Sequence, residues 1–193
     1  MATDGLRFTE IEHKFVVDPA FDLGAFRARV ESLRLAEAFR GKTARKLYWA
    51  LVVGVPKPPQ GKIDLKLAKE AGPAGERVAR DDEAGQRAIT LFATADTAAN
   101  RAAWLVMWPL TGRTHQLRVH CAAIGCPILG DRKYGGEEVS LAPVADSARR
   151  LHLHARRLTL PHPSGKGELR VEAEPPPHFR RTVEAFGFST VGD

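Results

Sequence analysis

Apolar side chains recur along this chain mainly in the patterns of β-strands. Residues 8–17 alternate apolar and charged side chains, as a strand with one buried face does, and further stretches are short apolar runs bounded by proline or glycine. We therefore expect strands at 8–17, 46–55, 61–67, 86–95, 102–110, 151–160 and 167–173. Residues 71–82 are rich in glycine and charge, which indicates a loop or hairpin, and 86–95 is expected to pair antiparallel with 102–110.

Three other stretches have helical features and are predicted as helices: 23–39, 114–124 and 178–186. In the middle one, Leu117, Cys121 and Ile124 fall on one face, and Gly125 supplies a stop signal. Runs of strands with few helices are typical of an α+β fold, here with a mixed, mainly antiparallel sheet and flanking helices.

Composition narrows the class of protein. The 193 residues suggest one domain, or one domain plus a short extension, and a hydrophobic fraction of 44% is ordinary for a globular protein with a real core. No apolar run approaches the roughly 20 residues of a membrane span, and the charged N-terminus does not resemble a secretory signal. The two cysteines, Cys121 and Cys126, fit free thiols in a reducing compartment, so we expect a cytoplasmic protein.

The charge points to a polyanionic partner. The net charge is +6, and the stretch 111–157 alone holds eight basic and four acidic residues. Lysine and arginine that bind phosphates release counterions, so such a surface favours nucleic acid. A solvated basic face without a partner is the simpler alternative.

The stretch 109–136, PLTGRTHQLRVHCAAIGCPILGDRKYGG, carries the clearest candidate chemistry. It predicts a strand, a tight glycine turn, a helix with polar side chains at its start, and a Gly-Asp loop. Arg113 and His115 near the helix N-terminus can meet phosphates together with free backbone N–H groups. Arg118, one turn further and beside Leu117, can hold a carboxylate or phosphate through two hydrogen bonds.

This stretch closely resembles the GRTHQLRVH…PILGD..YG signature of RluA-type pseudouridine synthases. Residues 46–50 match the K-x-Y-x-A strand of that family, and residues 61–69 resemble its G-x-I-D-x-P-L-x-K segment. The resemblance covers about residues 35–188. We therefore divide the chain into an extension at 1–34 and a partial synthase domain at 35–193.

The resemblance implies isomerisation of uridine to pseudouridine in structured RNA, either rRNA or tRNA, without a cofactor or metal. The target nucleotide would be flipped out of its helix, because its glycosidic carbon is inaccessible inside one. By motif matching, Tyr48 would stack on the flipped base, Arg118 would pair with the catalytic aspartate, and Leu117 would help wall the base pocket. The residues expected to bind substrate are Arg113, His115, Gln116 and Leu117.

One departure from the family concerns the aspartate itself. Its motif, close to H-R-L-D-x-x-T-S-G and upstream of the K-x-Y-x-A strand, does not occur in this sequence. Asp64 and Asp131 match other family positions, of a structural or loop-capping kind, so no catalytic carboxylate is assigned. A non-catalytic RNA-binding remnant is the alternative. Because the absent segment supplies strands in the family, we expect an exposed sheet edge, exposed apolar surface, and marginal stability or self-association.

The first strand suggests a third hypothesis. Glu10, Glu12 and Lys14 resemble the E-x-E-x-K opening strand of CYTH proteins, in which such side chains suit a metal–triphosphate complex. An exposed strand with cross-strand ion pairs explains the same pattern. The later strands with paired basic and acidic residues that a CYTH tunnel needs do not appear.

The remaining histidines and tryptophans carry weaker signals. His152 and His154 share a strand face but lack a third metal ligand, so a structural or RNA-facing role is expected. His115 and His120 are five residues apart, off the i, i+4 spacing of a helical zinc pair. The tryptophans lie in apolar strands and are expected in the core: Trp49, Trp104 and Trp108.

Overall fold

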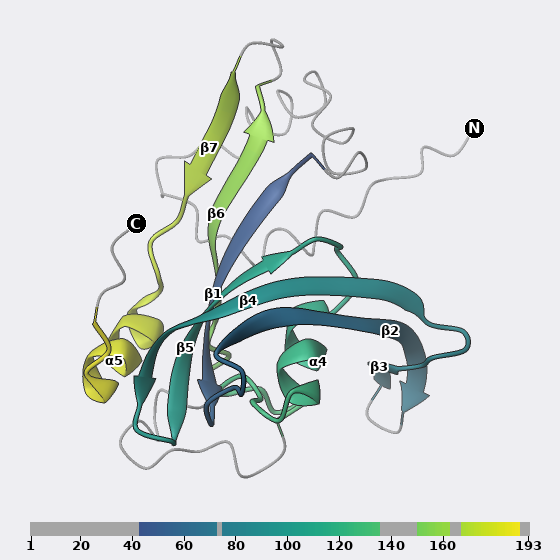
Figure 1. The fold of residues 1–193 in the computed structure, drawn as a ribbon, viewed down its shortest axis with the longest axis horizontal. Helices are drawn as coiled ribbons and strands as arrows, with labels where there is room; N and C mark the ends of the chain where they lie inside the picture. The colour runs from purple at the N-terminus through teal and green to yellow at the C-terminus, as the bar shows by residue number, and fades with distance from the viewer. Residues whose placement is uncertain (1–42, 73–74, 136–149, 163–166, 190–193) are drawn as a thin grey trace.

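The computed structural model describes residues 43–72, 75–135, 150–162 and 167–189. Its strands are β1 (Arg45–Val53), β2 (Gln60–Gly72), β3 (Gly75–Arg80), β4 (Gln86–Ala98), β5 (Ala102–Pro109), β6 (Leu153–Pro161) and β7 (Glu168–Glu172), and its helices are α4 (Gln116–Ala123) and α5 (Pro177–Phe186) (Figure 1). The predicted strand at 8–17 and helix at 23–39 lie outside the described residues. The division of the chain at residue 34 stays a prediction.

The seven strands form one sheet in the order β3-β2-β4-β5-β1-β6-β7, and each neighbouring pair is antiparallel. The expected α+β class is therefore confirmed. The stretch 71–82, expected as a loop or hairpin, holds the end of β2 and all of β3, which pair antiparallel with Gly72 opposite Gly75. Gly85 allows the close turn before β4, because a Cβ there would lie 2.8 Å from the backbone nitrogen of Leu67.

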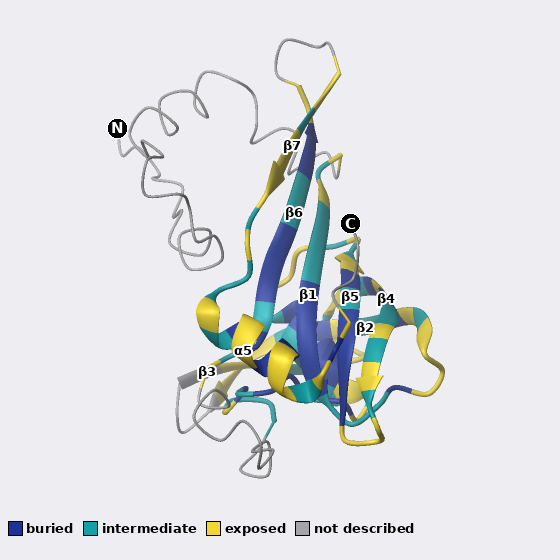
Figure 2. Ribbon diagram, turned by 90° about the vertical axis from the view of Figure 1, so that its left-hand side faces the viewer, coloured by how far each residue is buried: buried dark blue, intermediate teal, exposed yellow. Residues whose placement is uncertain are grey.

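The interior strand β1 buries both of its faces over residues 49–52. Ala50 and Val52 pack with Leu117 and Cys121 of α4 in one hydrophobic cluster. Trp49 and Leu51 face the opposite side and pack with Phe179 and Val183 of α5. Alternate residues of a strand point to opposite faces, so a run buried on both sides reads as continuously apolar. Figure 2 shows the lower part of β1 and much of β6 in the dark blue of buried residues.

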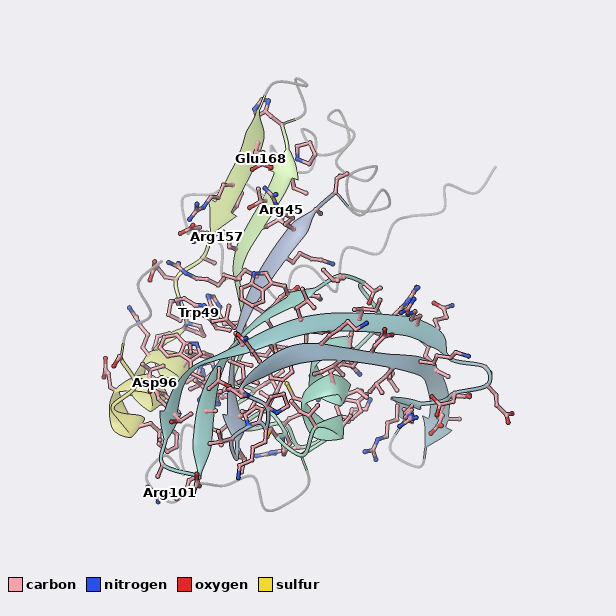
Figure 3. All side chains as sticks on the ribbon, in the orientation of Figure 1. Arg45, Trp49, Asp96, Arg101, Arg157 and Glu168 are labelled. Atoms are coloured by element: carbon pink, nitrogen blue, oxygen red, sulfur yellow. The ribbon has the colours of Figure 1, made fainter. Side chains whose placement is uncertain are left out.

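The core beneath α5 is built on aromatic rings. Trp49 and Trp104 meet edge to face with centroids 5.0 Å apart, and Phe179 of α5 lies 6.2 Å from Trp104. Figure 3 shows Trp49 near α5. Such rings prefer edge-on or offset packing, and each adds large buried area. The expectation that tryptophans lie in the core is confirmed for these two.

Trp108 is the exception, because its side chain is 37% exposed. Its neighbour Met107 points into the α4 cluster, so Trp108 faces the other side of the sheet. Its cross-strand partner Leu91 is 38% exposed. The core position predicted for Trp108 is therefore wrong. α5 covers the part of this sheet face that holds Trp49 and Trp104.

A β-bulge in β6 sets the position of two arginines. Leu47 pairs with Arg157 and Tyr48 pairs with Ala155, which leaves Arg156 as the extra residue. The Arg156 guanidinium lies 4.8 Å from the Trp49 ring centroid. The bulge thus places Arg157 opposite Leu47.

His152, just before β6, and His154 in β6 attach α5 and the segment before it. His152 Nε2 lies 2.9 Å from Thr182 Oγ1 on α5, and His154 Nε2 lies 2.9 Å from the carbonyl oxygen of Ala173. Both histidines are buried. The structural role expected as one alternative for them is confirmed. Within the described ranges, no group of three side chains is arranged to hold a metal ion.

Candidate functional site

The turn before α4 is held by one buried side chain, that of Gln116. Its amide nitrogen donates to the carbonyl oxygen of Ile89 and to Thr90 Oγ1, both at 2.9 Å. Its amide oxygen accepts from Thr111 Oγ1 at 2.7 Å and from the backbone N–H of Arg113 at 3.0 Å. The side-chain amide of Gln116, which was expected to bind substrate, therefore makes its hydrogen bonds within the protein. In this arrangement Gln116 fixes the shape of the turn.

His115 caps α4 in a left-handed conformation, with φ of 53°. Its Nδ1 lies 2.8 Å from Tyr134 Oη, and the same oxygen accepts the backbone N–H of Val78 at 3.1 Å. His115 is thus fixed against the loop that follows α4.

Arg118 forms a bidentate ion pair with Asp131. Its Nε lies 2.9 Å from Oδ2 and its Nη2 lies 2.7 Å from Oδ1. Asp131 is buried, whereas the Arg118 side chain keeps 19% of its surface exposed. The hydrogen bond to Asp131 raises the pKa of the guanidinium. Parallel N–H···O bonds of this kind fix the plane of an arginine as well as its charge.

Asp131 also caps the loop in which it lies. Its Oδ1 accepts the backbone N–H groups of Lys133 at 3.0 Å and Tyr134 at 3.1 Å. The structural, loop-capping role expected for Asp131 is confirmed. The partner of Arg118 among the described residues is therefore this loop carboxylate.

Tyr134 completes the support around Arg118. Its ring centroid lies 4.9 Å from the Arg118 guanidinium and 5.3 Å from that of Arg77 on β3. Guanidinium groups over an aromatic ring gain cation–π attraction. Sequence reasoning did not assign a role to Tyr134. Its place in the Gly-Asp…Tyr-Gly stretch of the family signature was the available signal.

Tyr48 and Leu117 meet on the α4 face of the sheet. Tyr48 lies in β1 between Met107 of β5 and Ala155 of β6, is half-buried, and packs against the cluster that contains Leu117. Leu117 itself is buried. The structure thus places Tyr48 against the cluster that contains Leu117, and separately joins His115 with Arg118 through Tyr134.

Basic groups gather at the turn that precedes α4. Arg113 is exposed, and its Nε donates to the carbonyl oxygen of Arg87 at 3.3 Å. A Cβ at Gly112 would lie 3.3 Å from Lys46 Nζ, so glycine leaves room for that ammonium. A helix N-terminus with two cations beside it is a suitable place for a phosphate.

His120 lies on the buried side of α4, and neither ring nitrogen has a hydrogen-bond partner. Burial lowers its pKa to about 4, so the ring is neutral near pH 7. The sequence pattern around His120 indicated only a possible half of a zinc pair, not this buried position.

The sequence model of the RNA pseudouridylate synthase family matches residues 29–123. An uncharacterised RNA pseudouridine synthase of Zymomonas mobilis is 39% identical over 157 residues, covering 80% of this chain and 68% of that protein. The chain belongs to the RNA pseudouridylate synthase family. The dual-specificity RNA pseudouridine synthase RluA of Salmonella typhimurium is 43% identical over 131 residues, which places the chain with the RluA-type members.

Other pseudouridylate synthases support this family assignment, but the chain matches only part of their length. Ribosomal large subunit pseudouridine synthase C of Rickettsia bellii is 34% identical over 152 residues. The chain spans 49% of that protein and 57% of the Salmonella one, about half of each. The structure of human RNA pseudouridylate synthase domain containing 4 superimposes with a TM-score of 0.64, at 28% identity, over 85% of this chain and 68% of that one.

The pseudouridylate synthase match includes most of the candidate site. Tyr48 and the stretch 113–118 lie inside it, whereas Asp131 and Tyr134 follow its last residue. The CYTH-like residues Glu10, Glu12 and Lys14 lie outside both this match and the described residues. Among the described residues, no helix has the length and hydrophobicity that crossing a membrane requires.

Proposed function

We propose that this chain binds structured RNA, either rRNA or tRNA, and isomerises a uridine in it to pseudouridine. The observation that carries the proposal is the fixed guanidinium of Arg118, held in one plane by Asp131 and Tyr134 in a member of the pseudouridylate synthase family. The proposal includes no cofactor or metal, as the family resemblance implies. The buried free thiols of Cys121 and Cys126 agree with a cytoplasmic location.

Binding begins with phosphates at the turn before α4. Lys46 and Arg113 supply charge there, and the start of α4 supplies the positive end of a helix dipole. Gln116 holds the turn, so these groups are placed before RNA arrives. Pre-placed donors add affinity because little ordering remains to be done on binding.

The flipped base would then bind on the α4 side of the sheet, beside Tyr48 at the edge of the cluster that contains Leu117. Tyr48 is half-buried and can offer its ring to a base, and Leu117 supplies an apolar wall from the helix. Stacking on an aromatic ring compensates for the stacking that a flipped base loses in its helix. The Tyr48 hydroxyl is the proposed assistant in proton removal.

A second candidate function follows from the state of Asp131. Its two oxygens accept two hydrogen bonds from Arg118 and two from backbone N–H groups, and the residue is buried. A carboxylate engaged in this way is poorly placed to attack a ribose. This favours, as the alternative, an RNA-binding domain that does not catalyse the isomerisation.

The two candidates are separated by chemistry. The full chain is incubated with rRNA or tRNA, and pseudouridine is mapped by carbodiimide-dependent stops in primer extension. The isomerase proposal predicts stops at defined positions, which Arg118→Lys weakens and the distant Arg101→Lys leaves unchanged. RNA binding without stops above background would support the non-catalytic alternative. Absence of RNA binding would contradict both.

A further inference from the structure

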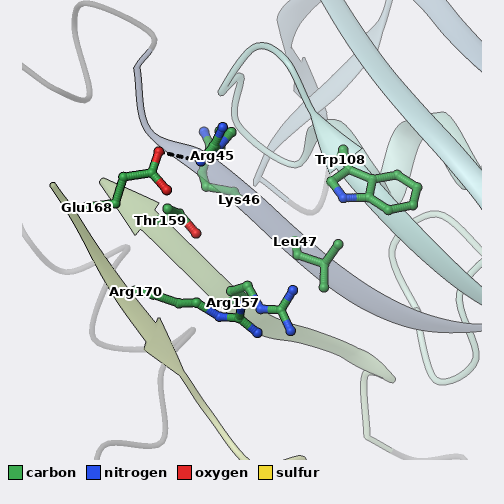
Figure 4. Close-up of a pocket in the computed structure, with 8 residues that line it drawn as sticks. All are labelled: Arg45, Lys46, Leu47, Trp108, Arg157, Thr159, Glu168 and Arg170. Atoms are coloured by element: carbon green, nitrogen blue, oxygen red, sulfur yellow. Dashed lines mark hydrogen bonds and ion pairs between the residues drawn. The ribbon is translucent and has the colours of Figure 1, made fainter. Parts of the chain in front are cut away.

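A cleft of about 270 Å³ opens at the ends of β1, β5, β6 and β7. Arg45, Leu47, Trp108, Arg157, Glu168 and Arg170 are among its eight lining residues, of which four are basic and one is acidic. Figure 4 shows Leu47 between the Trp108 ring and the Arg157 side chain. The cleft plays no part in the proposed base pocket, which lies on the α4 side of the sheet.

The floor of this cleft continues an apolar row across the sheet. Leu91 and Trp108 are cross-strand partners, and both are more than one-third exposed. Leu47, on the adjacent strand, lines the cleft with Trp108 and pairs on its other side with Arg157. An exposed ring on a sheet, next to arginines, is an arrangement that proteins use to stack single-stranded bases.

The carboxylates that pair with the cleft arginines can be replaced by phosphates. Arg45 pairs with Glu168, and Arg157 and Arg170 both pair with Glu172. The side chains of Arg45 and Arg170 are 69% and 55% exposed, and exposed pairs of this kind contribute about 1 kcal/mol or less, whereas the Arg157 side chain is only 23% exposed. A phosphate can therefore replace a carboxylate at small cost, and the excess of basic over acidic residues favours it.

We propose that this cleft binds a single-stranded stretch of RNA, with one base stacked on Trp108 and the backbone phosphates on Arg45, Arg157 and Arg170. The proposal rests on the proposed function, since it adds a second contact to the same RNA. Lys46 links the two sites, because it lines the cleft and its Nζ lies beside Gly112 at the turn before α4.

Charge also argues against a second copy of this chain as the occupant. In a two-fold dimer through this face, the same patch meets itself, so arginines of one copy would face arginines of the other. Like charges brought together at an interface oppose association. RNA has the opposite charge and supplies the flat rings that the indole can stack on.

The intrinsic fluorescence of the full chain tests the proposal. Of its three tryptophans, Trp49 and Trp104 are buried, so the exposed Trp108 reports on this face. Titration with a single-stranded oligouridylate of about eight nucleotides, a length typical of such sites, is expected to quench the signal. Trp108→Leu is expected to weaken binding about 5- to 150-fold, the range that one lost base–aromatic stack gives.

The arginines are tested through salt dependence. Arg45→Ala with Arg170→Ala is expected to reduce the slope of log affinity against log salt by about 1.4, because each single-strand phosphate contact contributes about 0.7. Arg101→Ala, an exposed arginine at the opposite end of the sheet from Arg45 (Figure 3), is the matched control and should leave the slope unchanged. The salt slopes of the arginine variant and its control test the proposal even if Trp108→Leu does not fold.

The outcomes separate this proposal from the proposed function. Quenching in the wild type, weaker oligouridylate binding by Trp108→Leu in a filter assay, and the reduced salt slope together support the cleft. If the wild type modifies rRNA or tRNA but both cleft variants bind oligouridylate as the wild type does, the cleft proposal is overturned and the function stands. Self-association that Trp108→Leu abolishes would overturn it in favour of a second copy. Failure of all RNA binding would overturn both.

Discussion

Two buried histidines make the stability of the folded chain sensitive to mild acid. His120 on α4 and His152, just before β6, are both fully buried, and burial lowers the pKa of each to about 4 from an ordinary 6.5. Below about pH 6.5 these histidines become protonated in the unfolded chain, whereas in the folded chain they stay neutral down to about pH 4. Stability is therefore present above pH 6.5 and is lost as the pH falls from 6.5 toward 4.

The size of the loss follows from the two pKa values. For one histidine, the proton-binding equilibria give about 2 kcal/mol lost between pH 7 and pH 5, so the pair loses about 4 kcal/mol. The free energy of unfolding of a native domain is roughly 5–15 kcal/mol, so this loss is a large share of it. His154 and His178 have their pKa values lowered as well, mainly by burial, and act in the same direction.

Urea unfolding at pH 7 and pH 5 measures this loss. His120→Leu removes one titrating ring without removing any hydrogen bond, so it should lose about 2 kcal/mol less than the wild type over that interval. Ile128→Val is the control, because it removes about 1 kcal/mol of packing at a buried site equally at both pH values. An equal loss in His120→Leu and wild type would refute the reasoning.

Three further predictions concern the site. Asp131→Asn leaves the partly buried Arg118 without a charge partner and should cost about 3 kcal/mol in denaturant unfolding, whereas a cost near zero would show the pair to be unimportant. Gln116→Leu removes the side-chain hydrogen bonds to the buried Thr90 hydroxyl and to the Arg113 N–H; it should cost about 2 kcal/mol and weaken RNA binding in filter assays, and unchanged binding would contradict its positioning role. Tyr134→Phe removes the hydroxyl bonds to His115 and β3 but keeps the ring over Arg118, so thermal melts should show a loss of about 1 kcal/mol, well below that of Tyr134→Ala.

Most of the secondary structure was predictable from local patterns. The spacing of Leu117, Cys121 and Ile124 correctly indicated the buried face of α4, and Gly125, with φ of 72°, ends the helix as expected. The strands β4 and β5 were placed with their antiparallel pairing. β2 extends past its predicted end because residues 68–72 pair with β3, a contact that a polar pattern does not reveal.

Long-range partners were not predictable from the sequence. The partner of Arg118 depends on a loop that returns to α4 from thirteen residues later. The role of Gln116 depends on a strand 26 residues earlier. Trp108 lies in an apolar strand as Trp104 does, but α5 covers only one of them, and local hydrophobicity does not say which. Local patterns therefore predicted elements better than contacts.

The most direct test of the account is tritium release from RNA labelled at carbon 5 of uridine. Forming the carbon–carbon glycosidic bond of pseudouridine displaces that hydrogen into water. The account predicts release from rRNA or tRNA by the full chain, reduced about tenfold or more in Arg118→Lys, where the fixed bidentate group is lost. Release at background level from RNA that the chain demonstrably binds would contradict isomerase activity.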